Sequence, residues 1–223
     1  MVQDSRGGHP TCWREFGDGP REALLIHCSL AHSGAWKGVA AQLGGSLHMR
    51  AFDLPGHGRS GPWTGERDMC ALSTAMAADM VGADGPMDVI GHSFGAVVAL
   101  SLAIEQPALV RSLVIIESVF VAAALADDPE LAARYGQKMK PYTDALERGD
   151  KEAAAREFLR DWGDGTPWEA LPAEQRAAMA AQIHLIAANS PSVLEDRPGL
   201  VENRLIETVK VPVLLIRGQR ARR

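Results

Sequence analysis

A short apolar run leads through a glycine-containing turn straight into a helical stretch, and this junction restricts the fold more than any other feature. Residues 87–91 have the apolar content of a buried strand, and residues 94–106 have a helical composition that ends at Pro107. Similar apolar runs occur at residues 23–27, 47–53, 113–117 and 211–217. Such runs are typical of parallel strands covered on both faces. The sequence therefore predicts an α/β fold with a mostly parallel sheet flanked by helices.

Two helices and one further strand complete the predicted core. Helices are expected at residues 36–43 and 73–81, between the apolar runs. Residues 11–16 are predicted to add a short antiparallel strand at the edge of the sheet. Alternation of strands and helices implies right-handed crossovers between parallel strands.

The long segment after the fourth apolar run has a different pattern. Residues 122–205 contain no strand candidate and are rich in Ala, Glu, Arg and Leu, which predicts several helices. Breaks between these helices are expected at Pro129, Pro141, Gly163–Pro167, Pro172 and Pro191. We therefore predict a core of residues 1–121 and 206–223 that carries a helical insertion of residues 122–205.

Composition is that of an ordinary globular protein and excludes some partners. The 223 residues are 46% hydrophobic and carry a formal net charge of −5, so neither a nucleic acid nor an anionic membrane is expected as a partner. No apolar run approaches the ~20 residues of a membrane span, and the polar N-terminus lacks a signal-peptide core, which predicts a cytoplasmic location. Cys12, Cys28 and Cys70 lack metal-ligand spacing, and we expect neither a metal nor a cofactor.

The turn after residues 87–91 has the pattern G-x-S-x-G, in the strand–turn–helix context that a nucleophilic serine requires. Its residues are Gly91, His92, Ser93, Phe94 and Gly95. A serine hydroxyl becomes a good nucleophile when a base takes its proton, and the N-terminal amides of the next helix stabilise negative charge. We therefore predict Ser93 as the nucleophile and the backbone N–H of Phe94 as an oxyanion donor. The alternative is a chance match in a glycine-rich chain.

Two upstream motifs accompany this turn. Asp53–Ser60 (DLPGHGRS) fits the pattern D-x-x-G-x-G-x-S, and Leu25–Ser29 (LIHCS) is followed by Trp36. The three motifs together resemble the α/β-hydrolase family, specifically its single-domain members with a helical cap. The resemblance implies that the backbone N–H of Ser29 is the second oxyanion donor. Cys28 stands where the family usually has glycine, and we interpret it as a small buried hydrophobe.

A serine hydrolase also needs a base and an acid, and the resemblance implies that both usually follow the fifth strand. Beyond residue 217 the sequence has no carboxylate side chain and reaches Arg223, so we expect a truncated chain in which the final strand, helix and histidine are missing. Glu117, at the end of the fourth strand, is a candidate acid because some family members place the acid there; otherwise it is a polar strand end. His32 and His184 are weaker candidates for the base, and the catalytic histidine stays unassigned.

The predicted activity is that of a serine hydrolase. A small or medium carboxylic ester, or a related lactone or thioester, would form an acyl-enzyme on Ser93. Without its histidine the chain is expected to be impaired; the alternative is a non-catalytic ligand-binding protein of this fold or an inactive fragment. The strand at residues 211–217, left at the sheet edge, predicts possible self-association. Five apolar side chains either line a substrate pocket or pack the inserted helices: Met139, Trp162, Trp168, Met179 and Ile183.

Overall fold

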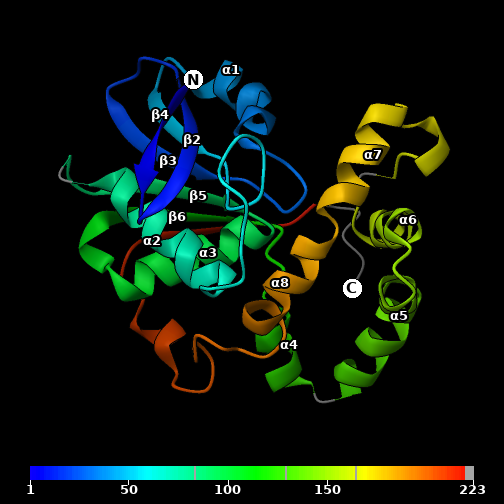
Figure 1. Ribbon diagram of the computed structural model, residues 1–223. Helices are drawn as coiled ribbons and strands as arrows, with labels where there is room; N and C mark the ends of the chain where they lie inside the picture. Colours follow the sequence, from blue (N-terminus) through cyan, green and yellow to red (C-terminus); the bar gives the residue numbers. More distant parts are fainter. Residues whose placement is uncertain (83, 129, 164, 219–223) are drawn as a thin grey trace.

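The computed structural model describes residues 1–82, 84–128, 130–163 and 165–218, and these ranges form one seven-stranded sheet with helices packed on it (Figure 1). The strands are β1 (Val2–Arg6), β2 (His9–Phe16), β3 (Arg21–Ile26), β4 (Leu47–Phe52), β5 (Met87–His92), β6 (Val110–Ile116) and β7 (Val213–Ile216). They lie in the order β1-β2-β4-β3-β5-β6-β7. Neighbouring strands from β4 to β7 in this order are parallel, whereas β2 is antiparallel to both β1 and β4. The predicted fold class is therefore confirmed.

The helices occur in two groups. The first group, among the strands, comprises α1 (Lys37–Leu43), α2 (Met69–Val81) and α3 (Phe94–Glu105). The second group, between β6 and β7, comprises α4 (Val121–Asp127), α5 (Glu130–Glu147), α6 (Lys151–Trp162), α7 (Ala173–Gln182) and α8 (His184–Val193). In Figure 1, α5, α6 and α7 stand to the right of the sheet, and α8 lies between them and the strands. Within the described ranges, no helix has both the length and the apolar character needed to cross a lipid bilayer.

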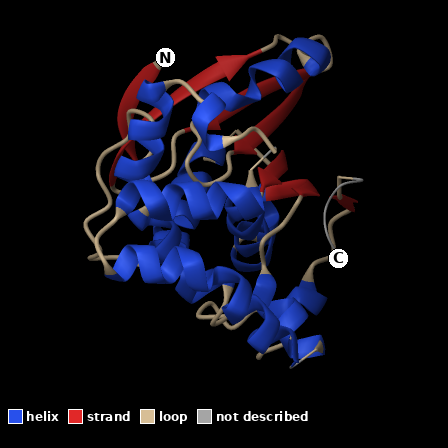
Figure 2. Ribbon diagram, turned by 90° about the vertical axis from the view of Figure 1, so that its right-hand side faces the viewer, coloured by secondary structure: helices blue, strands red, loops and turns tan. Residues whose placement is uncertain are grey.

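Successive residues of the central strand β3 point to opposite faces of the sheet. Leu24 and Ile26 belong to an apolar cluster with residues of α2 and α3, whereas Ala23 and Leu25 belong to a second cluster with Trp36, which precedes α1. All four strand residues are fully buried. Both faces of β3 are thus covered, and this explains the unbroken apolar run in its sequence; Figure 2 shows the strands and the helices packed on them from a second direction.

Strand β7 is an edge strand whose apolar side chains stay exposed. It pairs with β6 in parallel, and no strand in the described ranges pairs with its other side. Its four residues, Val213, Leu214, Leu215 and Ile216, are 47%, 56%, 72% and 43% exposed. An apolar edge with free N–H and C=O groups is a template for pairing with another chain.

Two predictions about the core were wrong. The polar N-terminus forms β1, which pairs with β2, so the strand predicted at residues 11–16 lies inside the sheet and not at its edge. Helix α2 begins at Met69 and not at residue 73, because the Asp68 carboxylate accepts a hydrogen bond from the Ala71 N–H at 3.0 Å and caps the helix earlier.

Two of the predicted helix breaks were also wrong. Pro141 lies within α5 and Pro191 within α8. Proline removes one helical hydrogen bond, but Pro141 is exposed and Pro191 half-buried, so water can satisfy the carbonyl that loses its partner. Pro172 precedes α7 as expected, and Gly163 follows α6. Pro129 and residues 219–223 lie outside the described residues.

A charged cluster clamps the amino ends of β3, β5 and β6. The Asp88 carboxylate accepts hydrogen bonds from the guanidinium groups of Arg21 and Arg111 and, at 2.6 Å, from the Ser112 hydroxyl. Burial by itself would raise the pKa of Asp88, but the bonds from Arg21, Arg111 and Ser112 outweigh it and hold the pKa far below its usual range. One carboxylate therefore ties three adjacent strands together.

We expect Asp88→Asn to lower the free energy of unfolding by about 2 kcal/mol. The amide leaves two arginines without their counter-charge, and the effect stays below that of a fully buried pair because the Arg21 side chain is half exposed. Urea denaturation at pH 7 measures this change. Because the pKa of Asp88 is depressed in the folded state, its contribution should be present above about pH 4 and be lost as the pH falls below that value.

Asp84→Asn is the matched control for this prediction. Asp84 accepts a hydrogen bond from Arg50 at 2.7 Å, but its side chain is 58% exposed, so a loss of less than about 1 kcal/mol is expected. Equal losses in the two variants would contradict the clamp.

Candidate active site

Ser93 lies on the turn between β5 and α3. Its φ of 55° is in the left-handed region, which a residue with a side chain adopts when its surroundings hold it there. The Ser93 N–H donates to the carbonyl oxygen of Ile116 at 2.9 Å, which ties the turn to β6. The side chain is half-buried, and its hydroxyl forms no hydrogen bond with any residue that the structure describes. The structure therefore places Ser93 on the expected strand–turn–helix junction, with its oxygen uncommitted.

Gly91 and Gly95 permit this turn, because a side chain at either position would collide with the main chain. A Cβ atom on Gly91 would lie 2.6 Å from the Cα of Ala96. A Cβ atom on Gly95 would lie 2.5 Å from the carbonyl oxygen of His27, just past the end of β3. Backbone atoms cannot move aside as a flexible side chain can, so these positions require glycine. The spacing of the motif thus lets the first turn of α3 pack directly on the ends of β5 and β3.

Two backbone amides near these strand ends are free to bind an anion. Phe94 is the first residue of α3, where a helix offers its N–H no internal acceptor. Ser29 lies in the turn after β3, in which the Ala31 N–H donates to the Cys28 carbonyl at 3.3 Å and Leu30 has a φ of 61°. Neither the Phe94 nor the Ser29 amide donates to a residue in the described ranges. The positive end of the α3 dipole adds to the attraction for negative charge.

The turns that carry Ser29 and Ser93 lie where the strand order of the sheet reverses. From β3 the chain continues to β4 on one side, and β5 lies on the other side. Ile26 of β3 is opposite Gly91 of β5 in the ladder, so the turns that follow leave the sheet at the same level. Ligands of open parallel sheets bind at such switch points, outside the carboxyl ends of the strands.

Asp53 organises the loop after β4 and ties it to the loop after β3. Its Oδ1 accepts from the Ser33 N–H at 2.7 Å, and its Oδ2 accepts from the Arg59 N–H at 2.9 Å. Gly58 has a φ of 53°, and a Cβ atom there would lie 2.9 Å from Oδ1, so glycine is required. Burial by itself would raise the pKa of Asp53, but the hydrogen bonds from Ser33 and the Arg59 amide outweigh it and keep the pKa below its usual value. Asp53 is thus a structural carboxylate.

His27 and His57 are buried and neutral. The His27 Nδ1–H donates to the Cys28 carbonyl at 2.7 Å, and its Nε2 accepts from the Leu54 N–H at 2.9 Å. The His57 Nδ1–H donates to the Pro55 carbonyl at 2.9 Å. Burial lowers the pKa of His27 to about 3 and that of His57 to about 4. With both ring nitrogens engaged, His27 cannot take a proton from Ser93.

The remaining imidazoles do not reach the Ser93 hydroxyl either. His32, a predicted candidate for the base, is exposed and accepts from the Gly34 N–H at 3.0 Å. His184, the other candidate, is exposed and bonds the Ala181 carbonyl at 3.1 Å. His92 precedes Ser93, and burial lowers its pKa. In the part of the chain that the structure describes, no imidazole is hydrogen-bonded to Ser93, and no three side chains form a metal-binding group.

Glu117 lies directly after β6, in a strained conformation with a φ of 46°. Its N–H donates to the Ile216 carbonyl at 2.9 Å, and its carboxylate accepts from the Gly218 N–H. Burial is the larger influence on His92 and lowers its pKa, while the charge of Glu117 raises it, so the two side chains lie near each other. The candidate acid is thus held between the ends of β6 and β7, close to the turn of Ser93.

One buried polar side chain reaches the turn after β3 from the inserted helices. Asn189 on α8 is 4% exposed, and its Nδ2 donates to the Ser29 Oγ at 2.8 Å. Its Oδ1 is buried and has no partner among the described residues. Sequence reasoning missed this residue, because a single asparagine 160 residues from Ser29 gives no local signal.

The apolar residues singled out in the insertion mostly pack its own helices. Met139, Trp168 and Ile183 are buried in one cluster, and Met179 packs against it. Trp162 is partly exposed and lies under the ammonium group of Lys138, 4.7 Å from the ring centre. The structure therefore supports the packing alternative for these side chains.

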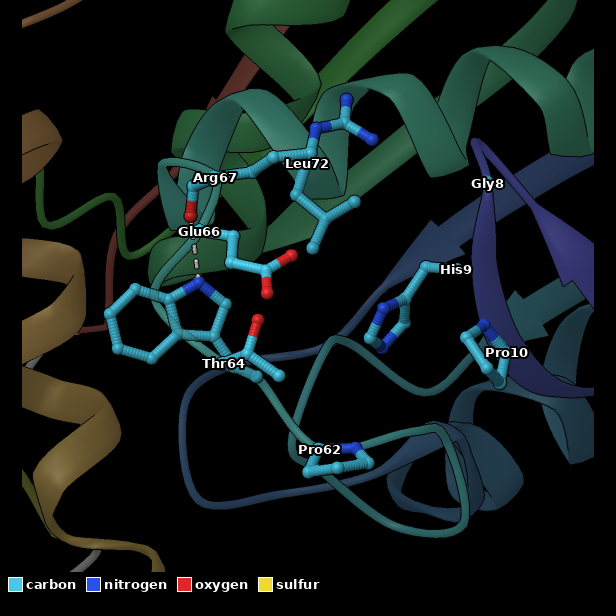
Figure 3. Close-up of a pocket in the computed structure, with 9 residues that line it drawn as sticks. Gly8, His9, Pro10, Pro62, Thr64, Glu66, Arg67 and Leu72 are labelled. Atoms are coloured by element: carbon cyan, nitrogen blue, oxygen red, sulfur yellow. Dashed lines mark hydrogen bonds between the residues drawn. The ribbon is translucent and has the colours of Figure 1, made fainter.

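Two surface cavities flank the loop of residues 61–67, and Ser93 lines neither of them. The first, of about 300 Å³, lies between this loop and the turn that joins β1 to β2. Figure 3 shows its wall, where the indole N–H of Trp63 donates to the Arg67 carbonyl at 2.9 Å. The second, of about 430 Å³, lies between the same loop and α8 and includes His184. Neither cavity supplies the acyl pocket that the site would need.

The fold and the turn define the class of the protein: an α/β protein with a serine at the sharp strand-to-helix turn, beside two free amides. A family model described as "Alpha/beta hydrolase family" matches residues 23–220. The chain belongs to this family.

Named relatives and solved structures agree with this assignment. "Lipase LipV" of Mycobacterium tuberculosis is 35% identical over 152 residues, 67% of this chain and 54% of the lipase. A pimeloyl-(acyl-carrier protein) methyl ester esterase of Neisseria meningitidis is 30% identical over 216 residues, 92% of this chain and 77% of the esterase. The chain thus spans about half the length of the first relative and three quarters of the second.

Solved structures with low identity show the same fold. The crystal structure of an alpha/beta hydrolase from Sphaerobacter thermophilus has a TM-score of 0.72 at 19% identity and covers 98% of this chain and 82% of its own. An epoxide hydrolase of Bacillus megaterium has a TM-score of 0.70 at 16% identity, over 97% of this chain and 82% of its own.

The buried neutral histidines predict a loss of stability in mild acid. In the unfolded chain these imidazoles bind protons below about pH 6.5, whereas His57 in the folded protein binds a proton only near pH 4. The contribution of neutral His57 to the free energy of unfolding is therefore complete above about pH 6.5 and falls as the pH approaches 4. Each such imidazole contributes a slope of at most about 1.4 kcal/mol per pH unit. We expect His57→Asn, which can keep the bond to Pro55, to flatten the fall in urea-unfolding free energy between pH 7 and pH 5. Ser5→Asn, at an exposed serine of β1, is the control and should keep the wild-type slope, and identical slopes for all three proteins would refute the assignment.

Proposed function

We propose that the protein hydrolyses small or medium carboxylic esters, or related lactones or thioesters, through an acyl-enzyme on Ser93. The observation that carries this proposal is the Ser93 hydroxyl on a strained strand-to-helix turn, near the amides of Phe94 and Ser29; none of these three groups is hydrogen-bonded to a residue that the structure describes. The serine oxygen would attack the carbonyl carbon, and the two N–H groups would bind the oxyanion that forms. The names of the relatives, a lipase and a methyl ester esterase, support an ester carbonyl as the target.

A serine nucleophile favours acyl transfer over epoxide opening. The likeness to an epoxide hydrolase rests on 16% identity and concerns the fold alone. Family members that open epoxides use an aspartate, whose carboxylate forms an ester intermediate with the substrate. Ser93 cannot form that ester, so the reaction class follows from the residue at the turn.

A complete triad would also need an acid and a histidine. The position of Glu117 after β6, near His92, supports it as the acid. Since no imidazole in the described ranges bonds to Ser93, we expect slow turnover from this chain. In serine proteases, an oxyanion hole and substrate binding without the triad still give about 10³–10⁴-fold over water.

A fluorophosphonate probe tests the role of Ser93. We expect the probe to label the wild-type chain slowly and at one site, because the serine oxygen attacks the phosphorus while the amides bind its oxygen. Ser93→Ala should abolish labelling, as read by intact-protein mass spectrometry. Ser5→Ala, at an exposed serine on β1, is the matched control and should label like the wild type.

Two outcomes would count against this proposal. Labelling that persists in Ser93→Ala would exclude Ser93 as the nucleophile. A wild-type chain that is folded, binds acyl compounds and stays unlabelled would support the alternative, a ligand-binding protein without turnover.

The inserted helices lie over the core and contact the turn of Ser29, where a cap would select substrates. We infer that residues 122–205 form a cap on a core of residues 1–121 and 206–223, because α8 packs on α2 and α3 and reaches the turn of Ser29.

We also infer a cytoplasmic location, which the three free cysteines Cys12, Cys28 and Cys70 support, since a reducing compartment keeps thiols unpaired.

The exposed edge of β7 supports self-association. Leu215, 72% exposed, lies in the middle of an unpaired apolar edge, and pairing with a second copy would satisfy its backbone. We expect Leu215→Lys to shift sedimentation velocity from concentration-dependent association toward monomer. Val2→Lys, at the opposite edge strand β1, should leave association unchanged. A wild-type chain that sediments as monomer at all concentrations would contradict this proposal.

A further inference from the structure

The turn that presents the Ser29 amide does not hold its shape by itself. Leu30, the next residue, has a φ of 61°, which leucine adopts only under constraint from its surroundings. The turn has one internal backbone hydrogen bond, from the Ala31 N–H to the Cys28 carbonyl at 3.3 Å, which is long for its type, and the same carbonyl accepts from the His27 ring at 2.7 Å. The direction of the Ser29 N–H must therefore be set in part by contacts from outside the turn.

These outside contacts come from the inserted helices. The Nδ2 of Asn189 donates to the Ser29 Oγ at 2.8 Å, and the Leu30 side chain packs against the apolar cluster of the insertion. Other side-chain hydrogen bonds from the same region to the core are weaker: Gln182 to Gly56 and Ser192 to Asp68 both measure 3.4 Å. The bond of Asn189 is thus the tightest of these polar links, and it ends on the residue proposed to bind the oxyanion.

Only part of the Asn189 side chain is hydrogen-bonded. The side chain is 4% exposed, and its Oδ1 is buried without a partner among the described residues. A buried polar atom without a hydrogen bond destabilises the fold, and an apolar side chain of similar size removes that penalty. Among the described residues, the Asn189 side chain thus has one hydrogen bond, the bond to Ser29, and Asn189→Leu removes it.

We propose that Asn189 is a positioning residue, which fixes the Ser29 turn from α8 and so sets the direction of the second oxyanion amide. This inference rests on the proposed function of Ser93 and extends it to the insertion. The fit of the helices on the core then controls the reactivity of the serine without any contact between Asn189 and the reacting atoms.

The test compares Asn189→Leu, Ser29→Ala and the double variant, with two readouts. The first is amide hydrogen exchange in peptides covering residues 27–32, which needs no activity. The second is the rate of fluorophosphonate labelling of Ser93. Asn189→Leu should speed exchange in this segment and slow labelling, each by about tenfold at most, as expected for one hydrogen bond. The melting temperature should change little, because the lost hydrogen bond and the removal of the unpaired Oδ1 act in opposite directions.

Two comparisons separate positioning from a general structural role. Ser192→Ala removes another hydrogen bond between α8 and the core. That bond ends on Asp68 and not on the Ser29 turn, so this variant should change neither readout. The double variant should be no worse than Ser29→Ala alone, since both changes break the same bond. Exchange in residues 27–32 that is unchanged in Asn189→Leu would overturn the inference. Wild-type protein that is never labelled, with exchange altered as expected, would instead refute the proposed function and leave the contact standing.

Discussion

The site depends on the close approach of the first turn of α3 to the ends of β5 and β3. Gly91 and Gly95 make this approach possible, because a Cβ atom on either would fall within 2.6 Å of main-chain atoms. The approach forces Ser93 into a left-handed conformation and leaves its hydroxyl without a hydrogen bond to any described residue. It also places the N-terminal amide of the helix next to that hydroxyl. The packing of α3 on the ends of β5 and β3 thus determines the position of the serine, its strained backbone and the electrostatic field around it.

Buried polar groups fix the loops that follow β3 and β4, next to the place where α3 packs on the strand ends. Asp53 joins the loop after β4 to Ser33, and His27 joins the end of β3 to Leu54. Both side chains keep the charge state that their hydrogen bonds require, an anionic Asp53 and a neutral His27. Asn189 extends the same framework to the inserted helices. The loops around Ser93 are therefore attached to the core at several points.

Local features were predictable from the sequence and long-range ones were not. The turn of Ser93 could be found because an apolar strand, two glycines and a helix follow one another within 20 residues. Strand β1 escaped prediction because its sequence, Val2–Arg6, is polar and gains its order from pairing with β2. The helix break predicted at Pro141 was wrong because an exposed proline can be accommodated within a helix. The contact between Asn189 and Ser29 exists only after folding brings distant segments together.

We propose that two main-chain amides bind the oxyanion that forms on the substrate carbonyl when Ser93 attacks it. A crystal structure of the chain with a phosphonate bound covalently to Ser93 tests it most directly. The account predicts that the phosphoryl oxygen lies about 2.7–3.1 Å from the backbone nitrogens of both Phe94 and Ser29. A phosphoryl oxygen directed to solvent, or an adduct on any other side chain, would contradict it.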